Sequence, residues 1–152
     1  MTGRRTVVLL AVGLVLPLLA GCGGDPKEHY CDAVEGHQEE LGTIVASDRP
    51  DALLEALDIF KDLQDKAPDD ISDEWQQVVG RIEALRDALD DAGVDPTSYD
   101  RDHPPAGLSD EDKAHIDAAA KQLGSGTTLR ALNDLDQQAR DVCQTPLLIG
   151  GA

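Results

Sequence analysis

Apolar residues recur every three or four positions from Pro26 to Cys143, and this periodicity constrains the fold more than any other feature. Such spacing places apolar side chains on one face of an α-helix. Five segments carry it: 26–46, 50–66, 72–92, 109–123 and 127–143. No stretch of useful length alternates apolar and polar residues as a strand does. The sequence therefore predicts an all-α fold, a bundle of four or five helices.

Each segment contributes a set of residues predicted to face the core. They are Tyr30, Val34, Leu41, Ile44 and Val45; Leu53, Leu57, Phe60 and Leu63; Trp75, Val78, Val79, Ile82, Leu85 and Leu89; Ile116, Ala119, Ala120 and Leu123; and Leu129, Leu132, Leu135, Ala139 and Val142. The large aromatic residues in these sets are expected to fill the core rather than to form a ligand platform.

Local signals mark the helix ends. Pro50 suits the first turn of a helix, and Ser72 and Ser109 are expected N-caps. Gly93 is expected to end the third helix. Residues 93–108 follow, with three prolines and little apolar surface, and are predicted to interrupt the helices as a loop. Loops of this length are often functional or disordered.

Residues 1–22 have the three parts of an export signal. Arg4 and Arg5 form the positive start, and the apolar run Val7–Leu19 is shorter than the roughly 20 residues that span a bilayer. The segment Leu19-Ala20-Gly21-Cys22 then resembles a bacterial lipobox. The resemblance implies cleavage before Cys22 and a diacylglyceryl group on its thiol, whose two acyl chains give stable attachment. An ordinary secretory signal that contains a cysteine is the alternative.

These features define the expected organisation and location of the chain. A signal peptide covers residues 1–21, and the lipidated Cys22 and a short linker cover 22–28. The helical domain covers 29–143, and a C-terminal tail covers 144–152. The protein is then expected at the cell membrane, lipid-anchored on its extracytoplasmic face. In the tail, the apolar run 147–149 either packs across the bundle or offers a docking edge to an envelope protein partner.

The chain is strongly acidic, with 30 acidic and 13 basic residues and a formal charge of −17. Removal of residues 1–21 takes away two basic residues and no acidic ones, which makes the charge −19. Binding to nucleic acid is not expected, because phosphate neutralisation needs clustered Lys and Arg. Anionic lipid head groups would also repel the folded body, so the lipid on Cys22 must provide the attachment.

The chain has three cysteines, Cys22, Cys31 and Cys143. If Cys22 carries lipid, two remain, which is an even count in an oxidising compartment. The sequence therefore predicts a Cys31–Cys143 disulfide that joins the start of the helical domain to its end. Two free buried thiols are the alternative.

The order of these features resembles that of small actinobacterial cell-envelope lipoproteins for which no activity is settled. The shared marks are the lipobox, the pair Tyr30-Cys31, the pair Ala67-Pro68 before an acidic helix with Trp75, and the late Cys143. The resemblance covers most of the chain. It implies an extracytoplasmic helical domain with one disulfide, and it implies no activity.

Metal-binding patterns are weak. The histidines His29 and His37 lie eight residues apart, whereas helical metal pairs prefer a spacing of four. The group Asp100, Asp102 and His103 lies close together in the 93–108 loop, where a solvated loop is the simpler interpretation. No segment matches a calcium-binding EF-hand loop. No metal or cofactor is therefore expected.

Catalytic patterns are also missing from the sequence. It has no GxSxG elbow, and carboxylates are too abundant for any pair to stand out as an acid and base. A non-catalytic binding or structural role in the cell envelope is the leading interpretation. The alternative is a carrier of a small apolar or cationic ligand in a cavity between helices. A filled core would count against the carrier, and a sizeable cavity lined by leucines would support it.

Overall fold

The computed structural model describes residues 25–47, 49 and 51–147, and all regular structure in these ranges is helical. The α-helices are α1 (Pro26–Ala46), α2 (Ala52–Glu55), α3 (Leu57–Lys66), α4 (Ser72–Asp91), α5 (Asp110–Leu123) and α6 (Gly126–Gln138). A 3₁₀ turn, Asp69–Ile71, precedes α4, and a π-helical turn, Ala139–Cys143, extends α6. The predicted all-α bundle is confirmed, with six helices in the described residues.

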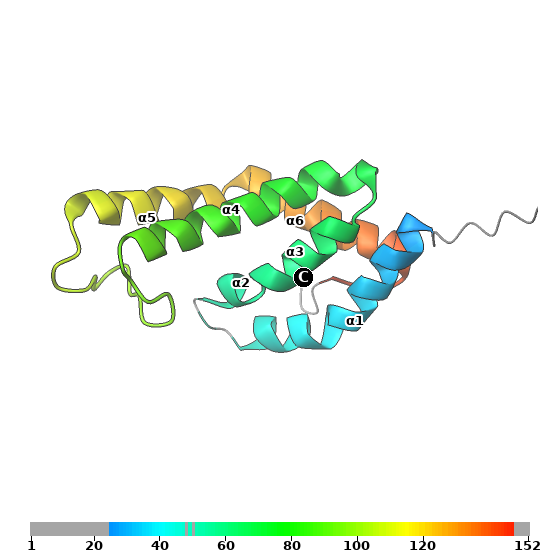
Figure 1. The fold of residues 1–152 in the computed structure, drawn as a ribbon, viewed down its shortest axis with the longest axis horizontal. Helices are drawn as coiled ribbons and strands as arrows, with labels where there is room; N and C mark the ends of the chain where they lie inside the picture. The colour runs from blue at the N-terminus through cyan, green and yellow to red at the C-terminus, as the bar shows by residue number, and fades with distance from the viewer. Residues whose placement is uncertain (1–24, 48, 50, 148–152) are drawn as a thin grey trace, which may run out of the picture.

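Helix α4 is the centre of the arrangement. It packs against α2, α3, α5 and α6, while α1 packs against α3 and against the π-helical turn. Figure 1 shows that α4 and α5 run side by side to one end of the elongated domain, and that α1 begins at the other end. The loop between α4 and α5 therefore lies far from the start of α1.

Three aromatic rings form the middle of the main core, as the sequence predicted. Trp75 lies with its ring centroid 5.8 Å from that of Phe60 and 6.5 Å from that of Tyr30, and all three side chains are buried. Trp75 Nε1 donates a hydrogen bond of 3.3 Å to Tyr30 Oη. Burial raises the pKa of Tyr30 to about 12, against the opposing effect of that hydrogen bond. The phenol is thus a neutral core group that gives the Trp75 N–H its partner.

Several helix ends follow the local signals. Ser109 caps α5, where its side chain accepts a hydrogen bond from the Asp112 N–H. Asp25 caps α1 in the same way through the Lys27 N–H, and Pro26 takes the first helical position, where its missing N–H costs nothing. Gly93 has a φ of +64° just after α4. This left-handed conformation ends the helix and is strained for residues with a side chain.

Two predicted details of the second and third segments are wrong. Ser72 is the first residue of α4 rather than its N-cap. Its backbone N–H donates to the Asp69 carbonyl and closes the 3₁₀ turn, and its hydroxyl donates to the same oxygen. The second segment forms α2 and α3 rather than one helix. Ala56 separates them, with a ψ of −6° where a helix has about −42°. Pro50, expected in the first turn of that segment, lies outside the described residues.

Two residues predicted to face the core are exposed instead. Leu129 is 50% exposed and Val45 is 40% exposed. In α6 the buried position belongs to Thr128, whose hydroxyl donates to the Gln122 carbonyl and whose N–H donates to the Ser125 cap. This cap sets the register of α6 and turns Leu129 outward. In α1, Ile44 takes the buried position beside Val45.

Cys31 and Cys143 lie together as predicted. Their sulfur atoms are 2.02 Å apart, the length of a disulfide bond, and their Cα atoms are 5.0 Å apart although 112 residues separate them in the sequence. Cys31 lies on α1 next to Tyr30, and Cys143 ends the π-helical turn. The pair therefore ties the first helix to the last at the edge of the aromatic core.

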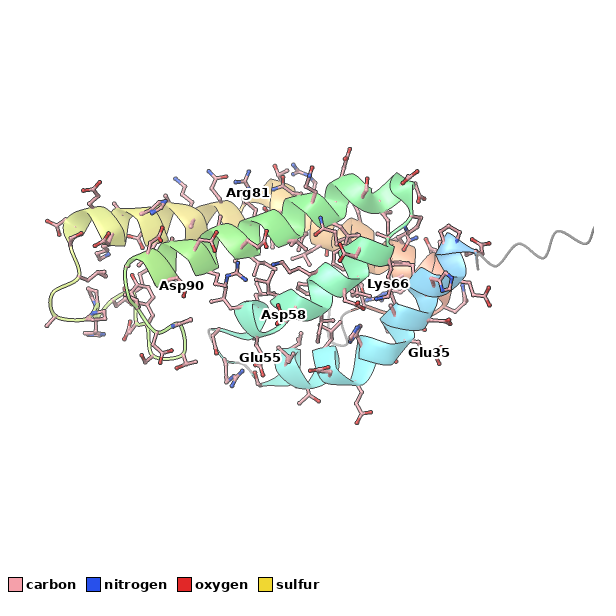
Figure 2. The ribbon with its side chains drawn as sticks, viewed as in Figure 1. Glu35, Glu55, Asp58, Lys66, Arg81 and Asp90 are labelled. Atoms are coloured by element: carbon pink, nitrogen blue, oxygen red, sulfur yellow. A yellow bond between two sulfur atoms is a disulfide. The ribbon has the colours of Figure 1, made fainter. Side chains whose placement is uncertain are left out.

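The surface carries the charge of the protein. Figure 2 shows charged side chains projecting outward from the helices, among them Glu35, Asp58 and Asp90, which are all exposed. In contrast to these charged residues, the apolar side chain of Leu147 in the C-terminal tail is buried in the core. Its backbone N–H donates to Asp136 Oδ1. None of the helices among the described residues is both long and apolar enough to cross a membrane.

Candidate functional site

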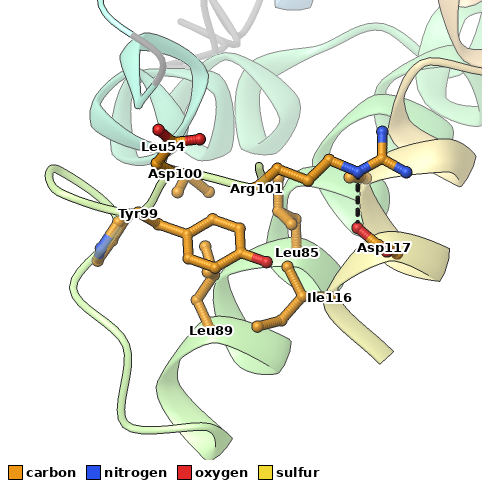
Figure 3. A pocket seen from close by; sticks show the side chains of 10 residues that line it. Leu54, Leu85, Leu89, Tyr99, Asp100, Arg101, Ile116 and Asp117 are labelled. Carbon is orange, nitrogen blue, oxygen red and sulfur yellow. Dashed lines mark ion pairs between the residues drawn. The ribbon is translucent and has the colours of Figure 1, made fainter. Parts of the chain in front are cut away.

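A cleft of about 490 Å³ lies between α4 and α5, next to α2 and under the loop of residues 92–109 (Figure 3). Its walls come from four separate segments. The lining residues are Leu54 of α2, Leu85 and Leu89 of α4, Pro96, Tyr99, Asp100 and Arg101 of the loop, and Ile116, Asp117 and Ala120 of α5. The floor is aliphatic and the polar groups all come from the loop and from one turn of α5.

The cleft forms because the loop folds back onto the helices that it connects. After the turn at Gly93, the Val94 N–H donates to the Leu89 carbonyl over 2.9 Å, which directs the chain back along α4. Val94 is buried there with Leu89 and Ile116, and Tyr99 packs against this second apolar cluster. The loop was expected to carry little apolar surface, yet these two residues both contribute to a small core.

The polar side of the cleft has an ion pair at its rim. Arg101 Nε lies 2.8 Å from Asp117 Oδ1, and Figure 3 marks this contact between the loop and α5. This contact brings opposite charges together at short range. Lys113 Nζ lies 3.3 Å from the other carboxylate oxygen of Asp117. The loop is thus joined to α5 across the opening of the cleft.

Asp117 is charged in this setting. Burial of its carboxylate opposes ionisation, but the hydrogen bond from Lys113 and the charge of Arg101 outweigh it and hold the pKa of Asp117 below its usual range. Asp100 at the rim also has a lowered pKa, chiefly because His103 Nδ1 hydrogen-bonds its carboxylate at 2.9 Å. Each carboxylate of the cleft therefore already has its own partners.

Two polar atoms in the cleft lack hydrogen bonds. Among the described residues, three side-chain oxygens are buried without a hydrogen-bond partner: Tyr99 Oη, Asp117 Oδ1 and Gln138 Oε1. The first two line the cleft, and the Tyr99 ring points its hydroxyl toward the side of the cleft that carries Asp117 (Figure 3). A buried hydroxyl without a partner costs about 1–3 kcal/mol, so such groups favour a partner that fits.

The residues predicted as sites from the sequence lie elsewhere. Cys31 lies on α1 and Cys143 ends the π-helical turn, neither of which lines the cleft, and Cys22 lies outside the described residues. His37 Nε2 pairs with Asp62 Oδ2 at 3.0 Å. In the group Asp100, Asp102 and His103, the Asp100 carboxylate is hydrogen-bonded to His103 Nδ1 and to the Asp102 N–H. Among the described residues, no three acidic, His or Cys side chains are placed to hold a metal.

Tyr99, Arg101 and Asp117 are not among the site residues predicted from the sequence. They belong to no motif, and the loop and α5 bring them together only in the folded chain. The available signal was modest: Tyr99, one of only two tyrosines, stands in a long loop otherwise rich in proline and acidic residues. An aromatic residue in such a place indicates a local apolar contact.

Comparisons with known proteins add no relative. The sequence matches no known protein family, no curated protein and no solved structure.

Proposed function

We propose that this chain is a lipid-anchored, non-catalytic binding protein of the cell envelope that holds a small, mainly apolar molecule in the cleft between α4 and α5. The observation that carries the proposal is the cleft itself. Its volume of about 490 Å³ falls within the range of roughly 300–1,000 Å³ typical of ligand sites. Leu54, Leu85, Leu89 and Ile116 supply an apolar lining with few polar groups, which is the usual composition of such a site.

The position of the cleft fits a protein held at one end. Only three residues, 23–25, lie between Cys22 and the start of α1. The cleft lies between α4 and α5 beneath the loop that connects them, and Figure 1 shows this loop at the opposite end of the domain from the start of α1. A lipid on Cys22 would thus leave the opening away from the membrane, where a ligand or an envelope protein partner has free access.

Filling the cleft is expected to abolish binding of a neutral apolar probe. Ala120 is half-buried on α5 and lines the cleft, so Ala120→Trp places an indole in the space that a ligand would occupy. The fluorescence of N-phenylnaphthylamine, an uncharged dye that brightens in apolar sites, measures binding. We expect the unsubstituted protein to bind the dye and Ala120→Trp to bind it at least about 10-fold more weakly, a loss of about 1.4 kcal/mol.

Ala114→Trp is the matched control, because Ala114 is an exposed residue of the same helix outside the cleft. It should bind the dye like the unsubstituted protein. Absence of dye binding in the unsubstituted protein, or equal losses in the two variants, would contradict the binding function.

Loss of the Cys22 thiol is expected to release the protein from the membrane. A chain with a formal charge of −17 has no electrostatic attraction to anionic lipids, so two acyl chains on Cys22 must supply the attachment. Cys22→Ala should therefore move the protein from the membrane fraction to the soluble fraction. Mass spectrometry of the unsubstituted membrane protein should find a diacylglyceryl adduct on Cys22. A Cys22→Ala variant that remains equally processed and equally membrane-bound would refute the anchor.

A further inference from the structure

The arrangement of polar atoms in the cleft restricts what kind of ligand it accepts. Tyr99 Oη is buried without a hydrogen-bond partner, and Asp117 Oδ1 is buried with no other partner than the ion pair with Arg101, which leaves room for a further donor on that oxygen. A phenol hydroxyl can donate or accept, whereas an ionised carboxylate only accepts. The two atoms are therefore complementary to one group that accepts from Tyr99 and donates to Asp117. A hydroxyl does both, and it is the smallest uncharged group that does.

The charges around the cleft disfavour an ionic ligand of either sign. An anion would have to share Arg101 with Asp117 and lie close to Asp100, in a chain with a formal charge of −17. A cation would find Asp117 already paired with Lys113 and Arg101, and Asp100 already bonded to His103. Neither ion would recover its hydration energy against the aliphatic floor. A neutral molecule loses the least water on binding there.

We infer that the ligand of this cleft is a neutral, mainly apolar molecule that carries a hydroxyl group, with the hydroxyl placed between Tyr99 Oη and Asp117 Oδ1. The inference rests on the proposed binding function and specifies its ligand class. The apolar body lies against Leu85, Leu89 and Ile116. Arg101, whose side chain is 68% exposed, lies at the rim beside the hydroxyl position.

Four probes that share one apolar body separate the possibilities: phenylbutanol, butylbenzene, phenylbutyrate and phenylbutylammonium. Each competes with N-phenylnaphthylamine for the full-length protein. We expect phenylbutanol to bind about 10-fold more tightly than butylbenzene, because it forms two further hydrogen bonds, and more tightly than either charged probe.

Two variants then assign the effect to the proposed contact. Tyr99→Phe removes the hydroxyl and keeps the ring, so it should weaken phenylbutanol about 3- to 10-fold and leave butylbenzene unchanged. Tyr30→Phe makes the same chemical change at the other tyrosine, which lies in the aromatic core outside the cleft, and should leave both probes unchanged.

The outcomes distinguish failure of the ligand class from failure of the binding function. Equal binding of phenylbutanol and butylbenzene, tightest binding of a charged probe, or no effect of Tyr99→Phe would overturn the hydroxyl inference while the binding function stood. If none of the probes displaces the dye and the dye itself does not bind, both proposals fall together.

Discussion

Replacing both Cys31 and Cys143 by serine is expected to lower the free energy of unfolding by about 4–5 kcal/mol. The bond closes a loop of more than a hundred residues, since 112 positions separate the two cysteines. A crosslink of that span restricts the unfolded chain severely and so raises its free energy relative to the folded state. Domains of this size have a total stability of about 5–15 kcal/mol, so the loss should be plain in a denaturant titration.

Loss of the disulfide should loosen one end of the domain more than the other. The bond ties α1 to the π-helical turn beside Tyr30, so opening it should free the end of the domain that carries α1. Cys22→Ser is the matched control, because it changes the same atom in a cysteine outside the pair, and it should leave the denaturation midpoint unchanged. Equal midpoints for the oxidised protein, the reduced protein and the double variant would show that the two thiols do not stabilise the fold.

Sequence reasoning succeeded where the determining interactions are local. The bounds of α1, the Ser109 cap and the end of α4 at Gly93 each depend on residues within one turn of the chain. Apolar periodicity also identified the aromatic core, because Trp75 and Phe60 each belong to a clear amphipathic stripe. The Cys31–Cys143 pairing followed from the count of cysteines rather than from any geometry.

Predictions from the sequence failed where a tertiary contact competes with the local pattern. Leucines at 129, 132 and 135 indicate one face of a helix, and Leu135 is indeed buried. Thr128, held by the Ser125 cap and by its hydrogen bond to the Gln122 carbonyl, takes the buried position at the start of α6, and Leu129 is exposed. Ser72 has the composition of an N-cap, yet a hydrogen bond to Asp69 makes it the first residue of the helix instead. In each case hydrogen bonds set the position of the residue in its helix, and apolar periodicity alone does not reveal such bonds.

The cleft lay beyond sequence reasoning for a different reason. Its polar atoms come from Tyr99 and Asp117, on a loop and on the helix that follows, and neither belongs to a recognised motif. Their proximity depends on how the loop folds back after Gly93. A sizeable cavity lined by leucines was the feature expected of a carrier, and the cleft has three leucines in its walls.

Truncation of Trp75 to alanine is expected to cost about 3–5 kcal/mol of folding free energy. The indole is fully buried and contacts the rings of Tyr30 and Phe60, so its removal leaves a cavity among residues of α1, α3 and α4. It also takes away the donor that pairs with Tyr30 Oη, which leaves a buried phenol without its partner. Circular dichroism during denaturation measures the change without relying on Trp75, the single tryptophan.

Leu129→Ala is the control for that experiment, because Leu129 is the most exposed large apolar side chain among the described residues. It should change stability by no more than about 0.5 kcal/mol, since a half-exposed side chain loses little buried contact. The pair of variants also tests the register of α6. If Leu129→Ala proves as damaging as Trp75→Ala, then Leu129 faces the core, and the Ser125 cap does not set the rotation of α6. A small cost for Leu129 with a large one for Trp75 is the result that the packing requires.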